Sequence, residues 1–327
     1  MTEQNEVQYS SGRKQEVSFR SGDATLSGTL YLPDGSPPYP AVVMLQGSGP
    51  TNRDSEGYFP PIRDRFLCHG IAVFSYDKPG IGDSSGDWRH RTLSDRADEA
   101  LDAVTFLQSH GAIAPERIGL WGHSQGGWVV PLAASRATSV AFAIASSGPG
   151  ISPPKQDCYA VEQTMRADGC PEEQIAQVMD YLATIQEAAR RSDPYEQVER
   201  SLLHAARAEP WYRYFTVDDA DEWQFFCAGS RNPYEPGSAL ECVTCPILAV
   251  FGGRDVLVPV PESVAIFDRS LQKAGNADST IVVFPQANHR LLIADHHTSS
   301  PDQAPFAPGY LDLMMQWTTQ RVHQTKQ

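Results

Sequence analysis

The feature that most constrains this chain is a repeated alternation between short apolar runs and helical patterns. A nearly continuous apolar run of five or six residues is typical of a strand that is covered on both faces of a sheet. Six such runs occur, at residues 41–46, 71–76, 117–121, 140–145, 247–251 and 280–284. Strands that alternate with helices predict a mostly parallel, doubly covered sheet, and therefore an α/β fold.

The helical patterns are recognised by apolar residues at spacings of three and four. Residues 94–110 carry this spacing, and Ser94 or Asp95 can cap the start of the helix. Two further helices are marked by Val264, Phe267 and Leu271, and by Tyr310, Leu313, Met314 and Trp317. At the N-terminal side, residues 16–19 and 25–32 flank Ser21-Gly22-Asp23, which predicts an antiparallel hairpin at the edge of the sheet.

One region breaks the alternation, because no convincing buried strand lies between about residues 150 and 240. A long amphipathic helix is expected after Pro171, another opens at Asp193-Pro194, and a cluster of aromatic residues follows. We therefore expect an α/β core of residues 1–149 and 241–327, with residues 150–240 inserted as a helical cap or lid. An alternative is a small helical subdomain whose aromatic residues only fill its own core.

Composition excludes several classes of partner. The chain has 40 acidic residues against 26 Lys and Arg, a formal net charge of −14, so nucleic acid and anionic membranes would be repelled. The longest apolar runs are far below the roughly 18 residues that span a bilayer. The segment Met1–Gln15 is polar and has no apolar stretch of a secretory signal, so a cytoplasmic location is expected.

The strongest chemical signal follows the run at residues 117–121. There the chain reads Gly122-His123-Ser124-Gln125-Gly126-Gly127 and continues into an apolar helix at 128–134. In a G-x-S-x-G pattern the serine sits on a sharp strand-to-helix turn, where larger flanking side chains would collide. Gly82-Asp83-Ser84-Ser85-Gly86 also matches, but it runs into a polar stretch with no helix. Context therefore favours Ser124 as the nucleophile and makes Ser84 and Ser85 turn residues.

Two other motifs lack the context that they need. The glycine-rich stretch at 80–86 follows a strand, but no helix begins directly after the glycines, as a dinucleotide site requires. Cys242 and Cys245 form a single C-x-x-C, and zinc would need a second pair or nearby histidines. These cysteines are better explained as small residues that lead into a buried strand.

A serine hydroxyl needs a base within hydrogen-bond reach, and the base needs an orienting carboxylate. Both are expected at later strand ends, because ligand sites of parallel sheets lie at the carboxyl ends of the strands. Asp255 follows the run at 247–251, and His289 follows the run at 280–284. The order Ser, Asp, His is the one that this strand-and-turn arrangement requires. Asp295, His296 and His297 are rival candidates further past the last strand.

The oxyanion formed when Ser124 adds to a carbonyl would need two backbone N–H donors. One is expected from Gln125, the residue after the nucleophile. The other is expected from Gly47-Ser48-Gly49-Pro50, the loop after the first buried run. We expect the Ser48 N–H to donate, with Gly47 as the second choice.

These motifs resemble the α/β-hydrolase superfamily over most of the chain outside residues 150–240. The resemblance is closest to bacterial esterase-like members, through Gly47–Pro50 followed by Arg53-Asp54, the loop 77–82, the Ser124 turn, Asp255 before Leu257-Val258-Pro259, and Asn288-His289. It implies a catalytic triad of Ser124, Asp255 and His289, hydrolysis of carboxylic esters or thioesters, and usually no metal and no cofactor. Gln46 departs from the pattern, since many members carry His before the oxyanion glycine, although this subgroup often has Gln.

The combined expectation is a serine hydrolase that forms an acyl-enzyme on Ser124 and acts on a small or medium ester. Acyl transfer to another acceptor, amide or peptide hydrolysis by the same triad, and a catalytically silent ligand-binding relative are the alternatives. The expected partner is a small-molecule substrate. Substrate identity and association between copies of the chain are left open by the sequence.

Overall fold

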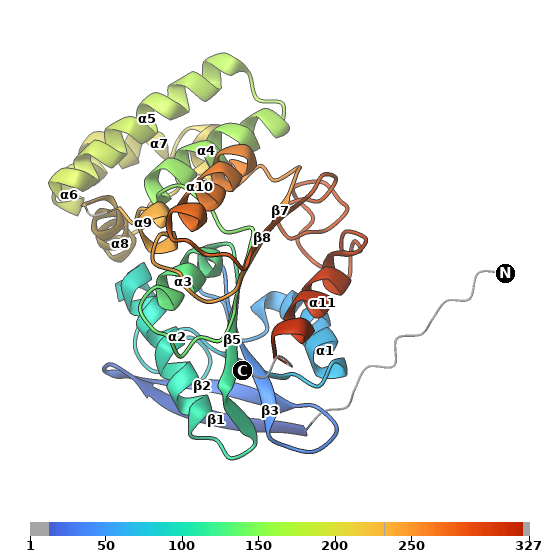
Figure 1. Ribbon diagram of the computed structural model, residues 1–327. Helices are drawn as coiled ribbons and strands as arrows, with labels where there is room; N and C mark the ends of the chain where they lie inside the picture. The colour runs from blue at the N-terminus through green and yellow to red at the C-terminus, as the bar shows by residue number, and fades with distance from the viewer. Residues whose placement is uncertain (1–12, 232, 323–327) are drawn as a thin grey trace.

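Within residues 13–231 and 233–322, which the computed structural model describes, the chain forms an eight-stranded sheet with helices on both faces (Figure 1). The strand order is β1-β2-β4-β3-β5-β6-β7-β8. β2 pairs antiparallel with β1 and β4, and the other neighbours are parallel. The strands are β1 (Arg13–Ser21), β2 (Ala24–Leu32), β3 (Tyr39–Leu45), β4 (Ala72–Tyr76), β5 (Ile113–His123), β6 (Ala143–Ser146), β7 (Ile247–Gly252) and β8 (Ser279–Phe284).

The expected α/β-hydrolase fold with an antiparallel N-terminal hairpin is confirmed. Each of the six apolar runs overlaps a strand, although β5 begins at Ile113 and β6 only at Ala143. All seven residues of β3 are buried, as a strand covered on both faces requires. Its side chains alternate between two apolar clusters: Val43 belongs to one face of the sheet, and Val42 and Met44 belong to the other.

The helices divide between these two faces. α2 (Leu93–Gln108), α3 (Gln125–Ala134) and α10 (Val260–Lys273) pack on the Val43 face. α1 (Phe59–Cys68) and α11 (Tyr310–Val322) cover the opposite face and lie side by side there (Figure 1). The sequence reading did not anticipate α1, because it opens with Pro60 and Pro61. Proline is compatible with the first turn of a helix, where its missing N–H has no partner to lose.

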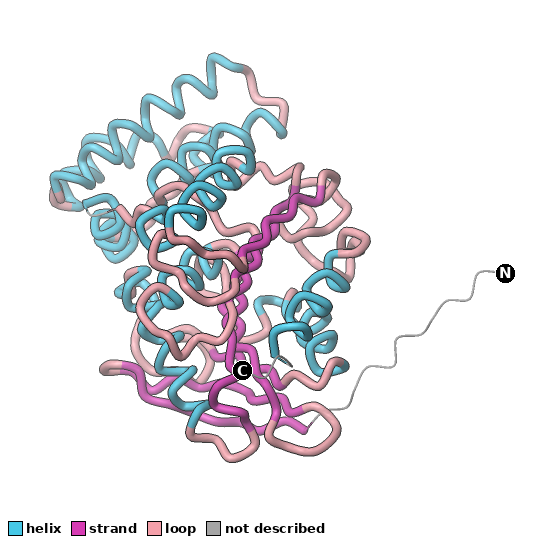
Figure 2. The backbone as a smooth tube through the Cα atoms, viewed as in Figure 1, coloured by secondary structure: helices cyan, strands magenta, loops and turns pink. Residues whose placement is uncertain are grey.

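Between β6 and β7 the described residues form helices and loops without a strand (Figure 2). We call residues 150–240 the helical insertion. Its own aromatic and aliphatic side chains form two apolar clusters, one around Trp211 and one around Trp223. Its helices are α4 (Pro153–Ala167), α5 (Glu172–Arg191), α6 (Tyr195–Val198), α7 (His204–Ala206), α8 (Ala220–Arg231) and α9 (Pro236–Leu240), with a π-helical turn at Glu199–Leu203 and a 3-10 turn at Pro210–Tyr214.

No helix among the described residues has both the length and the apolar character needed to cross a membrane.

The start of α2 corrects one expectation. The N-cap is Thr92, not Ser94 or Asp95: the Thr92 hydroxyl accepts from the Asp95 N–H, and the Asp95 carboxylate accepts from the Thr92 N–H. This reciprocal pair satisfies two N–H groups that the first turn would otherwise leave unpaired. Ser94 lies one residue inside the helix and contacts Arg136 instead.

Thr92→Ala is expected to lower the free energy of unfolding by about 1 kcal/mol, because the first turn of α2 loses its cap. The matched control is Ser94→Ala, which removes only an exposed side-chain contact and should change stability by clearly less. The measurement is the urea midpoint of each variant at an unchanged denaturant slope. An equal loss in both variants would contradict the assignment of the cap.

Candidate active site

Ser124 stands on a strained turn between β5 and α3. Its φ of 56° and ψ of −114° lie outside the regions that non-glycine residues normally adopt. The turn is tight because α3 crosses close to the sheet: a Cβ on Gly126 would lie 2.4 Å from the Leu45 carbonyl oxygen, and one on Gly122 would lie 2.2 Å from the Gly126 carbonyl oxygen. The two glycines therefore permit the crossing, and Ser124 remains partly exposed at its tip.

Asp255 and His289 meet at the ends of neighbouring parallel strands. His289 Nδ1 lies 2.7 Å from Asp255 Oδ2, and the Asp255 side chain is fully buried. The other carboxylate oxygen accepts from the backbone N–H groups of Leu257 at 2.8 Å and Val258 at 3.1 Å. These bonds fix the carboxylate so that its remaining oxygen faces the imidazole, as an orienting acid requires.

The spacing between the two loops depends on Gly252, the last residue of β7. A Cβ at this position would lie 2.1 Å from the carbonyl oxygen of Asn288, the residue before His289. The Asn288 side chain is buried and holds its own loop together: its Oδ1 accepts from the Arg290 and Leu292 N–H groups, and its Nδ2 donates to the Asp295 and Thr298 carbonyls. His289 is thus carried by a loop that several hydrogen bonds hold in place.

The hydrogen bonds that hold Asp255 and His289 in place do not fix the distance between the Ser124 hydroxyl and the His289 imidazole. His289 lies close to the turn that carries Ser124, since its ring centroid is 4.8 Å from that of His123, the residue before Ser124. Among the described residues, no hydrogen bond joins the Ser124 hydroxyl to the imidazole. Such bonds are often long in ligand-free enzymes and tighten when substrate binds. Burial lowers the pKa of His123 well below its usual value, so this neighbour stays neutral.

The expected oxyanion loop passes next to Ser124. A Cβ on Gly47 would lie 3.4 Å from the Ser124 Cβ, which places the loop after β3 beside Ser124. Ser48 and Gln125 both line a cavity of about 1040 Å³. Their backbone N–H groups donate to no partner within the described part of the chain. Two unpaired donors beside a serine hydroxyl are what a developing oxyanion needs.

A buried lysine holds this loop in place. Lys78, in the loop after β4, is 1% exposed, and its Nζ donates to the carbonyls of Gly47 at 2.5 Å and Gly49 at 2.8 Å and to Gln125 Oε1 at 3.2 Å. Burial lowers the pKa of Lys78 well below its ordinary value, and the nearby Arg96 charge adds to that effect. The three acceptors match the three donors of an ammonium group, which they stabilise in return.

The end of the same loop is held by an ion pair. The Arg53 guanidinium makes two bonds to Asp77, at 2.6 and 3.0 Å, and the Arg53 backbone N–H donates to the other Asp77 oxygen at 2.7 Å. From the sequence alone these residues are recognised only as part of a family pattern, and no role is predicted for Lys78. The available signal was the charged pair Asp77-Lys78 placed directly after a buried strand.

Gln46, the departure from the family pattern, is explained by its contacts. Its side chain is buried, its Nε2 donates to the Tyr76 carbonyl, and its Oε1 accepts from Arg96 at 3.2 Å. Arg96 is itself buried and paired with Glu99. A side-chain amide offers both a donor and an acceptor, so it joins β4 to α2 beneath the oxyanion loop.

The rival candidates lie elsewhere. The Ser84 hydroxyl donates to the Asp77 carbonyl and accepts from the Ser27 N–H, and Ser85 accepts from Thr25, so both tie a turn to β2. Asp295 accepts from Thr298, and His296 and His297 contact Asp168 in the helical insertion rather than Asp255.

The two weaker motifs do not form the sites that their patterns could suggest. Cys242 and Cys245 carry free thiols. After the glycine-rich stretch at 80–86, the next α-helix begins only at Leu93, so no helix N-terminus faces the glycines directly.

Comparison with known proteins identifies the family of the chain. The model of the alpha/beta hydrolase family matches residues 42–304. This chain is an alpha/beta hydrolase. It is similar to esterase EstD of Thermotoga maritima, 26% identical over 291 residues that cover 87% of this chain but only 63% of EstD. It is also 26% identical to thiohydrolase aneE of Aspergillus aculeatus over 287 residues, 82% of this chain and 84% of that protein.

The fold is shared with solved structures at lower identity. The esterase Pf2001 of Pyrococcus furiosus superposes with a TM-score of 0.61 at 18% identity, over 95% of this chain and 94% of that one. At this level the likeness concerns the arrangement of the sheet and its helices.

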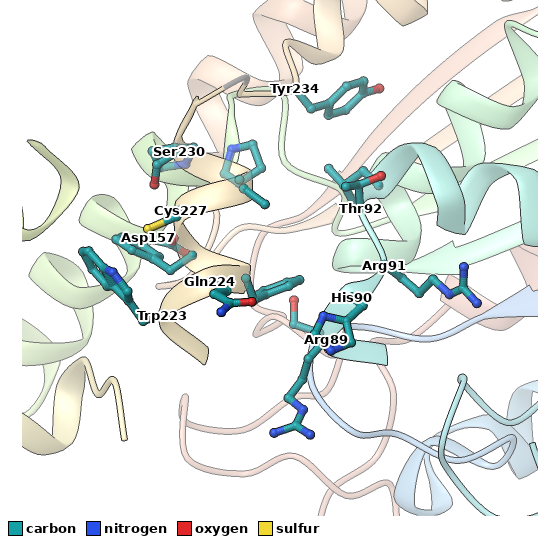
Figure 3. A pocket seen from close by; sticks show the side chains of 18 of the residues that line it. Arg89, His90, Arg91, Thr92, Asp157, Trp223, Gln224, Cys227, Ser230 and Tyr234 are labelled. Carbon is teal, nitrogen blue, oxygen red and sulfur yellow. The ribbon is translucent and has the colours of Figure 1, made fainter. Parts of the chain in front are cut away.

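The hydrolase has a cavity of about 1040 Å³ between its sheet edge and the helical insertion. Ser48, Gln125 and Trp128 line it from the core, and α4 and α8 line it from the insertion (Figure 3). The aromatic side chains Trp223, Phe225 and Phe226 face it. The insertion therefore does more than fill its own core, because the same cluster also contributes a cavity wall.

One residue of the cavity wall is a carboxylic acid that has no charged partner among the described residues. Asp157 on α4 lines the cavity near Trp223 and Cys227 (Figure 3), and among the described residues no cation or donor contacts its carboxylate. Burial raises the pKa of Asp157 to about 7. The cavity wall thus holds a carboxyl group that is protonated at mildly acidic pH and can then donate a hydrogen bond.

Lys78→Met is expected to lower kcat in any hydrolysis that the Ser124 site supports, measured with an activated test ester, by at least about tenfold with little change in KM, because the loop that presents Ser48 loses its anchor. The matched control is Lys155→Met, which changes an exposed lysine of the insertion. Steady-state kinetics of folded variants make the comparison. A change confined to KM, or an equal loss in both variants, would contradict the positioning role.

Asp157→Asn is expected to stabilise the hydrolase at about pH 8 but not at about pH 4. The pKa of Asp157 is about 7 in the native state and 3.8 for a free carboxyl. Between pH 3.8 and pH 7, Asp157 therefore binds more protons in the native state than in the unfolded state. Its stabilising effect is therefore present below about pH 4 and is lost as pH rises to about 7. Urea unfolding of both variants at both pH values tests this, with Asp83→Asn as the control because Asp83 is exposed. If Asp157→Asn changed the free energy of unfolding equally at both pH values, the prediction would be refuted.

Proposed function

We propose that this hydrolase is a serine esterase or thioesterase that uses Ser124 as nucleophile, His289 as general base and Asp255 as orienting acid. The observation that carries the proposal is the 2.7 Å contact between His289 Nδ1 and Asp255 Oδ2, at the sheet edge that also carries Ser124. The unpaired N–H groups of Ser48 and Gln125 supply the expected oxyanion hole. The names of the similar esterase EstD and thiohydrolase aneE support the choice of ester and thioester substrates.

In the first half-reaction the Ser124 oxygen attacks the substrate carbonyl while His289 Nε2 takes the hydroxyl proton. The imidazolium donates its Nδ1–H to Asp255, which stays ionised, and the oxyanion accepts from Ser48 and Gln125. The tetrahedral intermediate collapses, the bond to the alcohol or thiol breaks, and His289 returns the proton to this leaving group. An acyl group is then bound to Ser124.

The second half-reaction uses the same groups on water. His289 removes a proton from a water molecule, whose oxygen attacks the acyl carbonyl. The acid product leaves, and the proton from His289 restores the Ser124 hydroxyl. Both steps are complete without a metal or cofactor taking part.

The helical insertion acts in this proposal as a cap that shapes the substrate pocket. Its walls in the cavity combine Trp223 and Phe226 with Asp157. The cavity volume of about 1040 Å³ lies at the upper end of small-molecule sites and suits an acyl chain or alcohol of small or medium size.

Ser124→Ala should lower hydrolysis of an activated ester by several orders of magnitude, since triad residues act as a unit. Ser84→Ala is the matched control, because Ser84 belongs to the second G-x-S-x-G match but lies in a structural turn. A fluorophosphonate probe should label the wild-type chain once, at Ser124, and should not label S124A. Undiminished turnover in S124A, or labelling at another serine, would overturn the proposal.

A further inference from the structure

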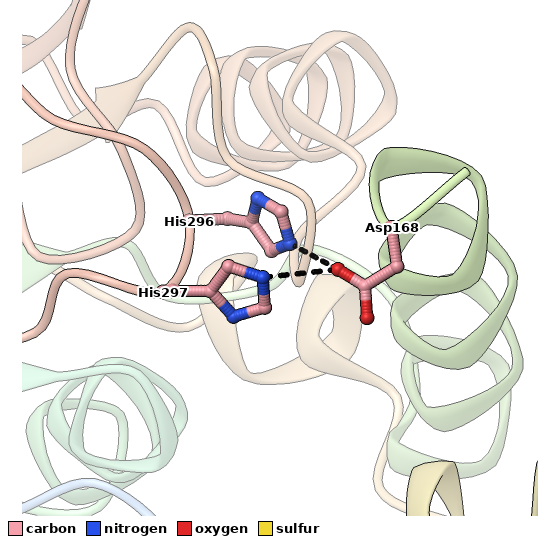
Figure 4. Close-up of side chains that lie close together, drawn as sticks. All are labelled: Asp168, His296 and His297. Atoms are coloured by element: carbon pink, nitrogen blue, oxygen red, sulfur yellow. Dashed lines mark hydrogen bonds and ion pairs between the residues drawn. The ribbon is translucent and has the colours of Figure 1, made fainter.

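Three potential metal ligands meet outside the catalytic machinery. Asp168 caps the C-terminus of α4 in the helical insertion, while His296 and His297 belong to the loop after β8 (Figure 4). His296 Nε2 lies 2.9 Å and His297 Nε2 lies 3.0 Å from the same oxygen, Asp168 Oδ1. The two imidazole rings are adjacent, with centroids 4.0 Å apart. We propose that Asp168, His296 and His297 bind a zinc ion that ties the insertion to the core.

The donor set fits this metal. Two imidazole nitrogens and one carboxylate oxygen are common zinc ligands, and a water molecule can complete a tetrahedron. Ligand atoms about 2.0–2.2 Å from a tetrahedral ion lie roughly 3.3–3.5 Å from each other. The three potential ligand atoms all lie within 4.8 Å of one another. The observed spacings of 2.9 and 3.0 Å therefore need to widen by only a few tenths of an ångström.

The surroundings of Asp168 orient its carboxylate for a metal, although the Arg213 guanidinium, which donates to the Tyr214 hydroxyl at 2.9 Å, brings a like charge near the group. The Tyr214 hydroxyl donates to Asp168 Oδ2 at 2.8 Å, which orients the carboxylate and leaves Oδ1 to face the two imidazoles. A hydrogen bond of this kind, behind a ligand, is typical of metal sites. Asp168 also lies at a helix C-terminus, where the helix dipole attracts positive charge. His297 is 67% exposed, so water and ions can reach the group.

The position of the group gives the ion a mechanical role. The loop that carries His296 and His297 is held from below by Asn288, whose amide donates to the carbonyls of Asp295 and Thr298. Asn288 directly precedes His289. An ion at this place would therefore fix α4 against the loop that presents the proposed base, without entering the cavity. The inference does not depend on the proposed triad.

Hydrogen bonding alone is the competing explanation of the geometry. Two neutral imidazoles, each donating its Nε2–H to Asp168 Oδ1, would also produce the observed distances. The two explanations differ in whether the group takes up zinc, and in whether loss of a single member abolishes that uptake.

The test uses the full chain, freed of metal with a chelator, dialysed and titrated with zinc chloride against a chromophoric zinc indicator. The wild type should bind one equivalent, and saturating zinc should raise its Tm. Loss of a residue behind a ligand alone costs about 10–100-fold in affinity. His296→Ala and Asp168→Asn should therefore each weaken binding by at least about tenfold and lose the rise in Tm.

The matched control is His69→Ala, which removes an exposed histidine of the α/β core whose ring is hydrogen-bonded to the Arg65 carbonyl. It should bind zinc as the wild type does. Absence of saturable zinc binding to the wild type overturns the proposal in favour of hydrogen bonding alone. Binding that persists unchanged in both H296A and D168N overturns it as well, because zinc would then be held elsewhere.

Discussion

The parallel register of β3, β5, β7 and β8 is the constraint on which the rest of the structure depends. Because these strands run in one direction, the loops after them all emerge at the same edge of the sheet. Ser48, Ser124, Asp255 and His289 each come from one of those loops. Residues separated by as many as 241 positions are therefore neighbours, and a slip of one strand would separate them and turn its side chains to the wrong face.

The edge of the sheet places the loops, and buried or half-buried polar groups then set their shape. Lys78 and Arg53 hold the two ends of the proposed oxyanion loop, Gln46 supports its base, and Asn288 braces the loop of the proposed general base. Each of these groups has several partners, which offsets the cost of removing it from water. The loops of the site are therefore held in place by these contacts, although their sequences are rich in glycine.

The fold was readable because burial on both faces leaves a direct mark on the sequence. Each apolar run from residues 41–46 to 280–284 became a strand, and the proposed catalytic residues follow those strands at fixed places. The same logic failed for α1, whose opening prolines hide the helical pattern, and for the cap of α2, where Thr92 stands one residue before the helix. The first error omits a whole helix, whereas the second concerns the end of an element, where one side chain decides the boundary.

Contacts between distant loops leave no comparable mark. Lys78 meets the oxyanion loop, and Asp168 meets His296 at a separation of 128 residues, only because the folded chain brings them together. A pattern search sees a lysine or a histidine but not its partner. The relation of Ser124 to His289 belongs to the same class, since it depends on side-chain torsions as well as strand order.

The route of the chain between β6 and β7 explains how one scaffold can serve different substrates. These strands are neighbours, and Ala143 pairs in register with Ile247. Two parallel strands that follow each other in the chain need a crossover connection. Here α9, which contacts α3 and α10, and the residues after it lead the chain back along the core to β7. The segment before α9 is thus an excursion at one rim of the molecule. Doubling the length of such an excursion adds only about 0.6 kcal/mol of closure entropy. Evolution can therefore rebuild the cavity wall that the insertion supplies, while the proposed catalytic residues at the sheet edge keep their places.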